Sequence, residues 1–104
     1  MADYVLSNKA DADLDEIYVY SYRTFGEAKA DAYFLSLRDC LQTLADNPHL
    51  GCFAGQIQPE LRCHRHAGHM VFYMVEPTGI FVIRVLHYAM DTPSHLNPAG
   101  NGEH

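Results

Sequence analysis

The sequence predicts an α+β fold in which a helical hairpin packs on one face of a small, mainly antiparallel sheet. Residues 70–76 and 80–87 are strand-length apolar runs separated by Pro77-Thr78-Gly79, a pattern typical of a β-hairpin. Residues 8–23 and 27–46 each carry apolar side chains at helical spacing. Because only Thr24, Phe25 and Gly26 separate these two segments, the helices are expected to lie antiparallel.

Length and composition indicate one globular domain. The chain has 104 residues, of which 48% are hydrophobic and 19% charged. We place the domain at residues 1–96 and a polar tail at residues 97–104. The apolar runs are too short to span a membrane and the N-terminus lacks a signal-peptide pattern, so we expect a cytoplasmic protein. A net charge of −6 argues against broad electrostatic binding of nucleic acid.

The elements follow in the order β-α-α-β-β-β. A short first strand ends at Ser7, which is suited to cap the first helix, and Asp13 is expected on the solvent side of that helix. Thr24 and Glu27 have capping-box spacing and are expected to open the second helix. Residues 61–66 form a weaker strand that precedes the central hairpin. The predicted core residues joining helices to sheet are Leu14, Ile17, Leu37, Leu41, Tyr73 and Ile83.

The register of the central hairpin decides which side chains face the helices. Pairing Glu76 with Ile80 points Met70, Phe72, Met74, Val82, Arg84 and Leu86 away from the helical hairpin. Since no later apolar helix is available to cover them, this face is expected to bind a partner. A one-residue slip in register would instead exchange the two faces and bury these residues under the helices.

The three cysteines, Cys40, Cys52 and Cys63, form no Cys-x-x-Cys pair and are expected to be reduced thiols. A metal cluster of Cys63 with His64, His66 and His69 is an alternative to solvated or partner-facing histidines. We favour the latter because the paired ligand spacings of metal sites are missing. We therefore expect neither a metal nor another cofactor.

Arginines concentrate on the predicted sheet of an otherwise acidic chain. Arg62, Arg65 and Arg84 are consistent with a docking site for an anion or an acidic peptide. They are equally consistent with pairing to local carboxylates such as Glu60 and Glu76. Both interpretations stay open, although a charged Arg84 among apolar strand residues must have some partner.

Across residues 6–91 the sequence resembles the ParE branch of the RelE/ParE toxin superfamily, the toxins of type II toxin–antitoxin, or plasmid stabilisation, modules. The matching residues are Leu6, Ser7, Ala10, Asp13, Leu14, Ile17, Tyr22, Gly26, Ala28, Leu44, Ala45, Asn47, Pro48, Gly51, Leu61, Arg62, Val71, Phe72, Tyr73, Ile83, Arg84, Val85, Leu86, His87 and Asp91. The β-α-α-β-β-β order derived above agrees with the fold of that superfamily.

The resemblance implies a toxin that forms a hetero-oligomer with a cognate ParD-like antitoxin and is neutralised by it. When free, the toxin is expected to inhibit DNA gyrase by protein contact. The resemblance implies no catalytic activity, no direct binding of nucleic acid and no association with a membrane. The alternative is a ribosome-dependent mRNA endoribonuclease like RelE. RelE is rich in lysine and arginine, whereas the lysines of this chain are only Lys9 and Lys29, both on predicted helices, and the predicted sheet has none. A degenerate toxin retained as a binding module is a third possibility.

Two sets of site residues follow from these alternatives. The expected antitoxin-binding residues are Arg62, Arg65, Met70, Phe72, Met74, Val82, Arg84 and Leu86. If the chain cleaves RNA instead, its catalytic residues are expected to be Arg65, Arg84, His87 and Tyr88.

Overall fold

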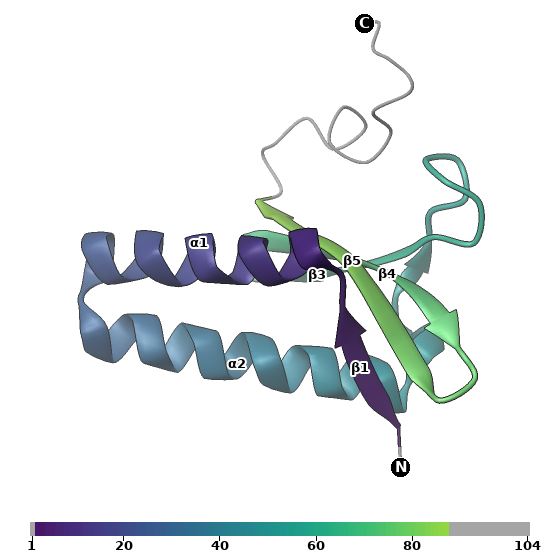
Figure 1. Ribbon diagram of the computed structural model, residues 1–104, viewed down its shortest axis with the longest axis horizontal. Helices are drawn as coiled ribbons and strands as arrows, with labels where there is room; N and C mark the ends of the chain where they lie inside the picture. Colours follow the sequence, from purple (N-terminus) through teal and green to yellow (C-terminus); the bar gives the residue numbers. More distant parts are fainter. Residues whose placement is uncertain (1, 88–104) are drawn as a thin grey trace, which may run out of the picture.

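The computed structural model describes residues 2–87, and the expected polar tail, Tyr88 and Asp91 lie outside them. Two helices, α1 (Asn8–Phe25) and α2 (Glu27–Asp46), form an antiparallel hairpin beside a five-stranded sheet (Figure 1). The remaining elements are β1 (Asp3–Leu6), the single 3₁₀ turn η1 (Pro48–Leu50), β2 (Cys52–Phe53), β3 (Arg62–His66), β4 (His69–Glu76) and β5 (Gly79–His87). No helix within residues 2–87 has the length and apolar character needed to cross a membrane.

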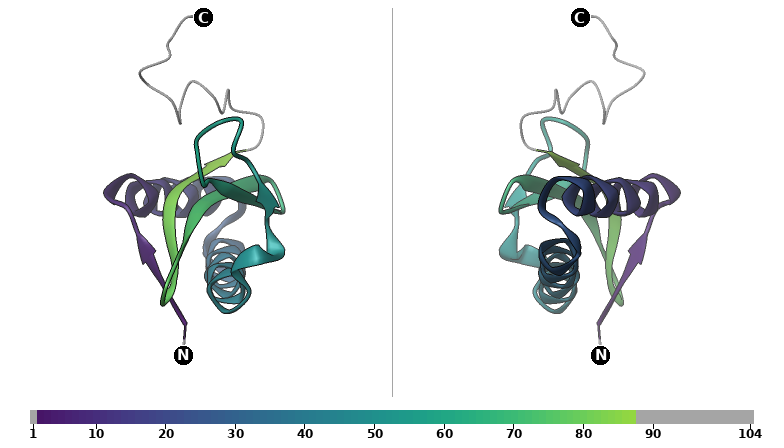
Figure 2. Two further views of the ribbon diagram at one scale, coloured as in Figure 1. Left: turned by 90° about the vertical axis from the view of Figure 1, so that its right-hand side faces the viewer. Right: turned by 90° about the vertical axis from the view of Figure 1, so that its left-hand side faces the viewer.

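The sheet has the strand order β1-β5-β4-β3-β2. β1 runs parallel to β5, and every other neighbouring pair is antiparallel. This arrangement confirms the predicted α+β fold and the mainly antiparallel sheet. The two-residue strand β2 lies in residues 49–60, for which the sequence predicts a loop or a partly extended link. Figure 2 shows α2 nearly end-on and α1 obliquely, with the twisted sheet beside them.

The two helices begin in different ways, α1 with a side-chain cap and α2 without one. Ser7 caps α1 as predicted: its hydroxyl accepts a hydrogen bond from the Ala10 N–H at 2.9 Å and donates to the Ile83 carbonyl at 2.7 Å. The prediction of a capping box at Thr24 is wrong. Helix α1 continues to Phe25, and the residue that precedes α2 is Gly26. Gly26 has a φ of 91°, a conformation that glycine adopts without a steric penalty.

The main core lies between the helical hairpin and the sheet. It confirms the predicted burial of Leu14, Ile17, Leu37, Leu41 and Tyr73. The prediction for Ile83 is wrong, since this side chain packs on the opposite face of the sheet. The buried members of the main core are Ala10, Leu14, Ile17, Leu37, Leu41, Leu44, Ala45, Val71, Tyr73, Ile80, Val82 and Val85.

The register of the β4–β5 hairpin differs from the prediction by one residue at the turn. Glu76 pairs with Gly79 rather than Ile80, so the loop is only Pro77-Thr78. Gly79 is required there, because an ideal Cβ would lie 1.7 Å from the carbonyl oxygen of Asp3 on the adjacent strand. A shift between Phe72 and Tyr73 then leaves Ile83 as an extra residue on β5.

This bulge explains why only part of the predicted face assignment is correct. Between the turn and the bulge, Ile80 and Val82 face the helices. After the bulge, Val85 faces the helices, as the predicted alternation requires. Val82 was therefore assigned to the wrong face, and it is fully buried. A uniform alternation cannot reproduce a strand whose phase changes at an inserted residue.

The second face of the sheet is also covered within this chain. Residues 54–61, between β2 and β3, contribute Ala54 and Leu61 to a second buried cluster with Phe72 and Leu86. Each of these four side chains is at most 2% exposed. The expectation that Phe72 and Leu86 are open to a partner is therefore wrong. The covering segment is a loop whose apolar side chains are Ala54, Ile57 and Leu61, and a search for apolar helices does not find it.

Candidate functional site

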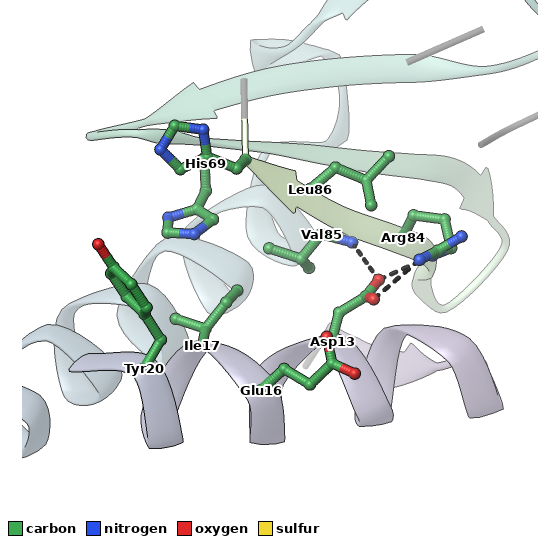
Figure 3. Close-up of a pocket in the computed structure, with 9 residues that line it drawn as sticks. Asp13, Glu16, Ile17, Tyr20, His69, Arg84, Val85 and Leu86 are labelled. Atoms are coloured by element: carbon green, nitrogen blue, oxygen red, sulfur yellow. Dashed lines mark hydrogen bonds and ion pairs between the residues drawn. The ribbon is translucent and has the colours of Figure 1, made fainter. Parts of the chain in front are cut away.

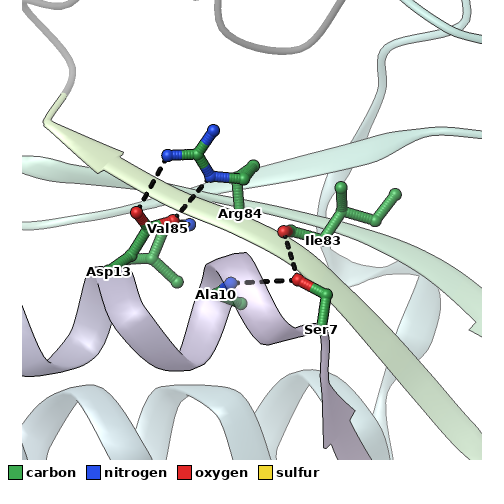
Figure 4. A network of polar contacts seen from close by, with 6 residues as sticks. All are labelled: Ser7, Ala10, Asp13, Ile83, Arg84 and Val85. Carbon is green, nitrogen blue, oxygen red and sulfur yellow. Dashed lines mark hydrogen bonds and ion pairs between the residues drawn. The ribbon is translucent and has the colours of Figure 1, made fainter.

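A buried ion pair connects α1 to β5. The Arg84 guanidinium donates to both carboxylate oxygens of Asp13, from Nε at 2.8 Å and from Nη2 at 2.9 Å, and the Val85 N–H donates to the same carboxylate at 3.0 Å (Figure 4). The hydrogen bonds with Asp13 raise the pKa of Arg84 above its ordinary value. Arg84 therefore has the partner that its apolar surroundings require, although the partner is neither Glu60 nor Glu76.

The assignment of Asp13 to the solvent side of α1 is wrong. Asp13 is 8% exposed and lies between the buried residues Ala10 and Ile17, three positions after one and four before the other. This spacing places it on the apolar stripe of the helix, so the sequence did contain a signal for its burial. Which basic residue meets it depends on the tertiary structure.

The other two arginines of the predicted cluster also have partners. Arg62 donates through Nη2 to the Gly51 carbonyl at 2.8 Å and so holds the segment that follows η1. Arg65 is exposed on β3, where its Nε donates to the Ala67 carbonyl at 3.2 Å across the β3–β4 turn. These contacts place the three arginines at separate positions and leave Arg65 as the most exposed of them.

Three histidines form a row across the sheet at the end nearest the β3–β4 turn. His66 on β3 is opposite His69 on β4, and His69 is opposite His87 on β5. The row contacts α2, because the Tyr33 hydroxyl lies 2.6 Å from His69 Nδ1 and the Ser36 hydroxyl lies 3.1 Å from His66 Nε2. Directly opposite residues point to the same face of a sheet, so all three rings point toward the helical side.

Two histidines of the row, His66 and His69, have lowered pKa values. Burial lowers the pKa of His69, and its neighbours His87 and His66 lower it further. Burial also lowers the pKa of His66. Among residues 2–87, no three histidine, cysteine or acidic side chains have an arrangement that holds a metal ion. For His66 and His69 the lowered pKa favours the neutral imidazole, and each of these two rings lies within hydrogen-bond distance of a hydroxyl group on α2.

Two of the residues expected for RNA cleavage meet in one pocket. Arg84 and His87 line an open pocket of about 360 Å³, together with Tyr20 and His69 (Figure 3). Arg65 does not line this pocket, and Tyr88 lies outside the described residues. In Figure 3 the Arg84 side chain is turned to Asp13, so its charge is already paired on the pocket wall.

An apolar strip remains on the outer face, beyond the area that residues 54–61 cover. Val5 is opposite Phe81, and Phe81 is opposite Met74, so these three form a row across β1, β5 and β4. Val5 is 54% exposed, and Phe81 and Met74 are partly exposed. Ile83 and Met70 extend the row beside the second buried cluster. We call Val5, Met70, Met74, Phe81 and Ile83 the outer strip.

Comparisons with known proteins agree with this architecture. The family described as "ParE toxin of type II toxin-antitoxin system, parDE" matches residues 4–92. The chain belongs to this family. Curated relatives include Toxin ParE1 of Caulobacter vibrioides, 34% identical over 96 residues covering 92% of this chain and 99% of that protein. Toxin ParE1 of Mycobacterium tuberculosis is 36% identical over 94 residues, covering 89% and 96% respectively.

A solved structure shares the fold of this ParE family member. The chromosomal ParDE toxin–antitoxin system from P. aeruginosa contains a chain that aligns with a TM-score of 0.69 at 23% identity, covering 84% of this chain and 96% of that one. The family match and the two curated relatives confirm the family membership predicted from the sequence, and the solved structure confirms the fold.

Proposed function

We propose that this ParE-family toxin is neutralised by a cognate ParD-type antitoxin and, when free, inhibits DNA gyrase through protein contact. The observation that carries the choice of target is the Asp13–Arg84 pair. A nuclease active site needs cations that are available to a scissile phosphate. Here the arginine beside the histidines already donates two hydrogen bonds to a carboxylate.

The positions of the lysines support the same choice. Lys9 and Lys29 lie on α1 and α2, and the described strands contain no lysine. The chain as a whole carries a net charge of −6, which disfavours docking on ribosomal RNA. Contact with a protein target requires no such excess of positive charge.

A supercoiling assay tests this proposal directly. Purified protein is titrated into DNA gyrase with relaxed plasmid and ATP, and the products are separated on agarose before and after detergent and protease. We expect loss of supercoiling or accumulation of cleaved plasmid as the protein concentration rises. Protein premixed with the antitoxin is the matched control and should leave gyrase active. Unchanged supercoiling at a large molar excess of free protein contradicts the proposal.

The histidine row favours a second candidate, ribosome-dependent cleavage of mRNA. His69 is held by Tyr33 and lies beside His87, with ring centroids 5.5 Å apart, so two imidazole rings of the kind that transfer protons meet in one pocket. Primer extension on translating ribosomes distinguishes the two candidates. Cuts that disappear in His87→Ala, with gyrase unaffected, would establish the nuclease instead.

The outer strip is the surface we assign to the antitoxin. Of the antitoxin-binding residues expected from the sequence, Phe72, Val82 and Leu86 are buried and leave the proposed surface. Met70 and Met74 are partly exposed and stay in it. The strip is apolar, and methionines adapt to varied partner side chains. Arg65 is exposed at the β3–β4 turn, and its guanidinium has the chemistry that binds carboxylates of a partner.

Titration calorimetry with the antitoxin tests this surface. Val5→Asp and Met74→Asp put charges into the outer strip and should each weaken binding at least tenfold, about 1.4 kcal/mol. Leu35→Asp is the matched control, because Leu35 is 57% exposed on α2. Arg84→Glu is unsuitable, since it would bring a second carboxylate against Asp13. Equal affinities for all three variants would exclude the outer strip as the docking surface.

A further inference from the structure

Two of the three cysteines lie directly opposite each other on adjacent strands. Cys52 on β2 pairs with Cys63 on β3 in the antiparallel ladder, while Cys40 is separate on α2. All three are free thiols in the structure. The sequence separates Cys52 from Cys63 by ten residues, and only the β2–β3 pairing brings them together.

The pairing of β2 with β3 brings the Cα atoms of these two cysteines within the range that a disulfide spans. Two residues further along the ladder, past the Phe53–Arg62 pair, the Ala54 N–H donates to the Leu61 carbonyl at 2.8 Å. Hydrogen-bonded and non-hydrogen-bonded pairs alternate, so Cys52 and Cys63 also form a hydrogen-bonded pair, with Cα atoms about 5.5 Å apart. Disulfides span Cα separations of about 4.4–6.8 Å. Opposite residues also project to the same face of the sheet.

The two thiols differ in exposure in a way that sets the order of reaction. Cys52 is exposed on the edge strand, whereas Cys63 is half-buried against the second cluster. Burial raises the pKa of Cys63, and the neighbouring Cys52 raises it further. An external oxidant therefore reacts with Cys52 first. Cys63 lies opposite and can then react with the oxidised sulfur of Cys52.

We propose that Cys52 and Cys63 form a reversible thiol-modification site that a small-molecule disulfide oxidises to an intramolecular disulfide. The Cys52 thiolate attacks one sulfur of the oxidant, which expels the first thiolate and leaves a mixed disulfide on Cys52. The Cys63 thiolate then attacks the Cys52 sulfur and expels the second. Two protein thiols are oxidised, one external disulfide is reduced to two thiols, and both protein protons pass to water or to the released thiolates.

The bond would act on the segment that covers the outer face of the sheet. Residues 53–62 lie between the two cysteines and supply Ala54 and Leu61, which bury Phe72 and Leu86. Before oxidation, the pairing of the two-residue strand β2 with β3 connects the start of this segment to the sheet. Closing the loop covalently restricts its open conformations, so the segment should become less accessible to proteases.

Thiol counting on the full-length protein tests the proposal. The reduced protein is incubated with oxidised glutathione, quenched with N-ethylmaleimide and analysed by intact mass and peptide mapping. We expect the alkylatable thiols to fall from three to one, at Cys40, with a peptide cross-linked between Cys52 and Cys63. Dithiothreitol should restore all three. Limited proteolysis should show slower cleavage within residues 53–62 after oxidation.

Two variants make the test decisive. Cys63→Ser should stop at a glutathione adduct on Cys52, and Cys40→Ser should lose every alkylatable thiol on oxidation. A persistent glutathione adduct on Cys52 in the natural sequence, with Cys63 still alkylated, would overturn the proposal. So would a disulfide-linked dimer through Cys52 or a cross-link to Cys40. Circular dichroism of each form checks that the fold is retained.

Discussion

The Asp13 carboxylate and the Arg84 guanidinium join residues 71 positions apart in the sequence, with two hydrogen bonds of 2.8 and 2.9 Å. The same carboxylate accepts the Val85 N–H. This contact fixes the first half of α1 to β5 just past the end of β1. It also satisfies the charge of an arginine that would otherwise be a candidate ligand for phosphate.

Removal of the Asp13 carboxylate should therefore destabilise the fold strongly. Asp13→Ala leaves the Arg84 charge and the Val85 N–H without this partner, so we expect the free energy of unfolding to fall by about 3 kcal/mol. Urea denaturation at pH 7 measures the change. Asp15→Ala is the control on the exposed side of the same helix and should stay within about 0.5 kcal/mol of the natural protein. Similar losses in the two variants would contradict a specific role for the pair.

Leu41 tests the packing of α2 on the sheet. It is fully buried in the main core, so Leu41→Ala should lower the free energy of unfolding by about 2–5 kcal/mol through lost burial and a residual cavity. Leu35→Ala, at a site 57% exposed on the same helix, should have little effect. Thermal and urea unfolding of both variants provide the comparison. Equal stabilities would mean that the helix is rotated relative to the structure.

Tyr73 connects the sheet to the turn after α2. Its hydroxyl donates to the Pro48 carbonyl at 2.7 Å and accepts from the Gly51 N–H at 3.0 Å. Tyr73→Phe keeps the ring but leaves these groups without the hydroxyl, which should cost about 1–3 kcal/mol of unfolding free energy. Tyr20→Phe, at a residue 65% exposed, is the control. Faster amide hydrogen exchange at Gly51 should accompany the loss.

The histidine row should make stability depend on pH. The folded state lowers the pKa of His66 and His69 below 6.5, the ordinary value expected on unfolding. The unfolded chain therefore binds more protons below that pH, and stability should fall as pH decreases from about 6.5 through the folded pKa values. Above about pH 7 this contribution is fully present.

Urea unfolding at pH 7.5 and pH 5.5 measures this effect. A variant with His66→Gln and His69→Gln should lose less stability between the two pH values than the natural protein. His49→Gln, at an exposed residue of η1, is the control and should retain the full pH dependence. An identical pH dependence in the double variant would show that other groups are responsible.

The sequence by itself determined the elements that depend on local patterns. Helical spacing, the Ser7 cap and the apolar strand runs were enough to predict the helical hairpin, the order of the main strands and most of the core. The motifs spread over the chain were enough to identify the family. Each of these features depends on residues close in the sequence or on a recurring order of short segments.

Only the tertiary structure decided the contacts between distant residues. The carbonyl of Asp3 excludes a side chain at Gly79 and so shortens the hairpin loop, and the bulge at Ile83 then restores the phase of β5. The partner of Arg84, the cover over Phe72 and the pairing of Cys52 with Cys63 likewise depend on which strands become neighbours. A periodic pattern specifies which face of an element is apolar, but the register and the packed neighbour are set by long-range sterics and charge pairing.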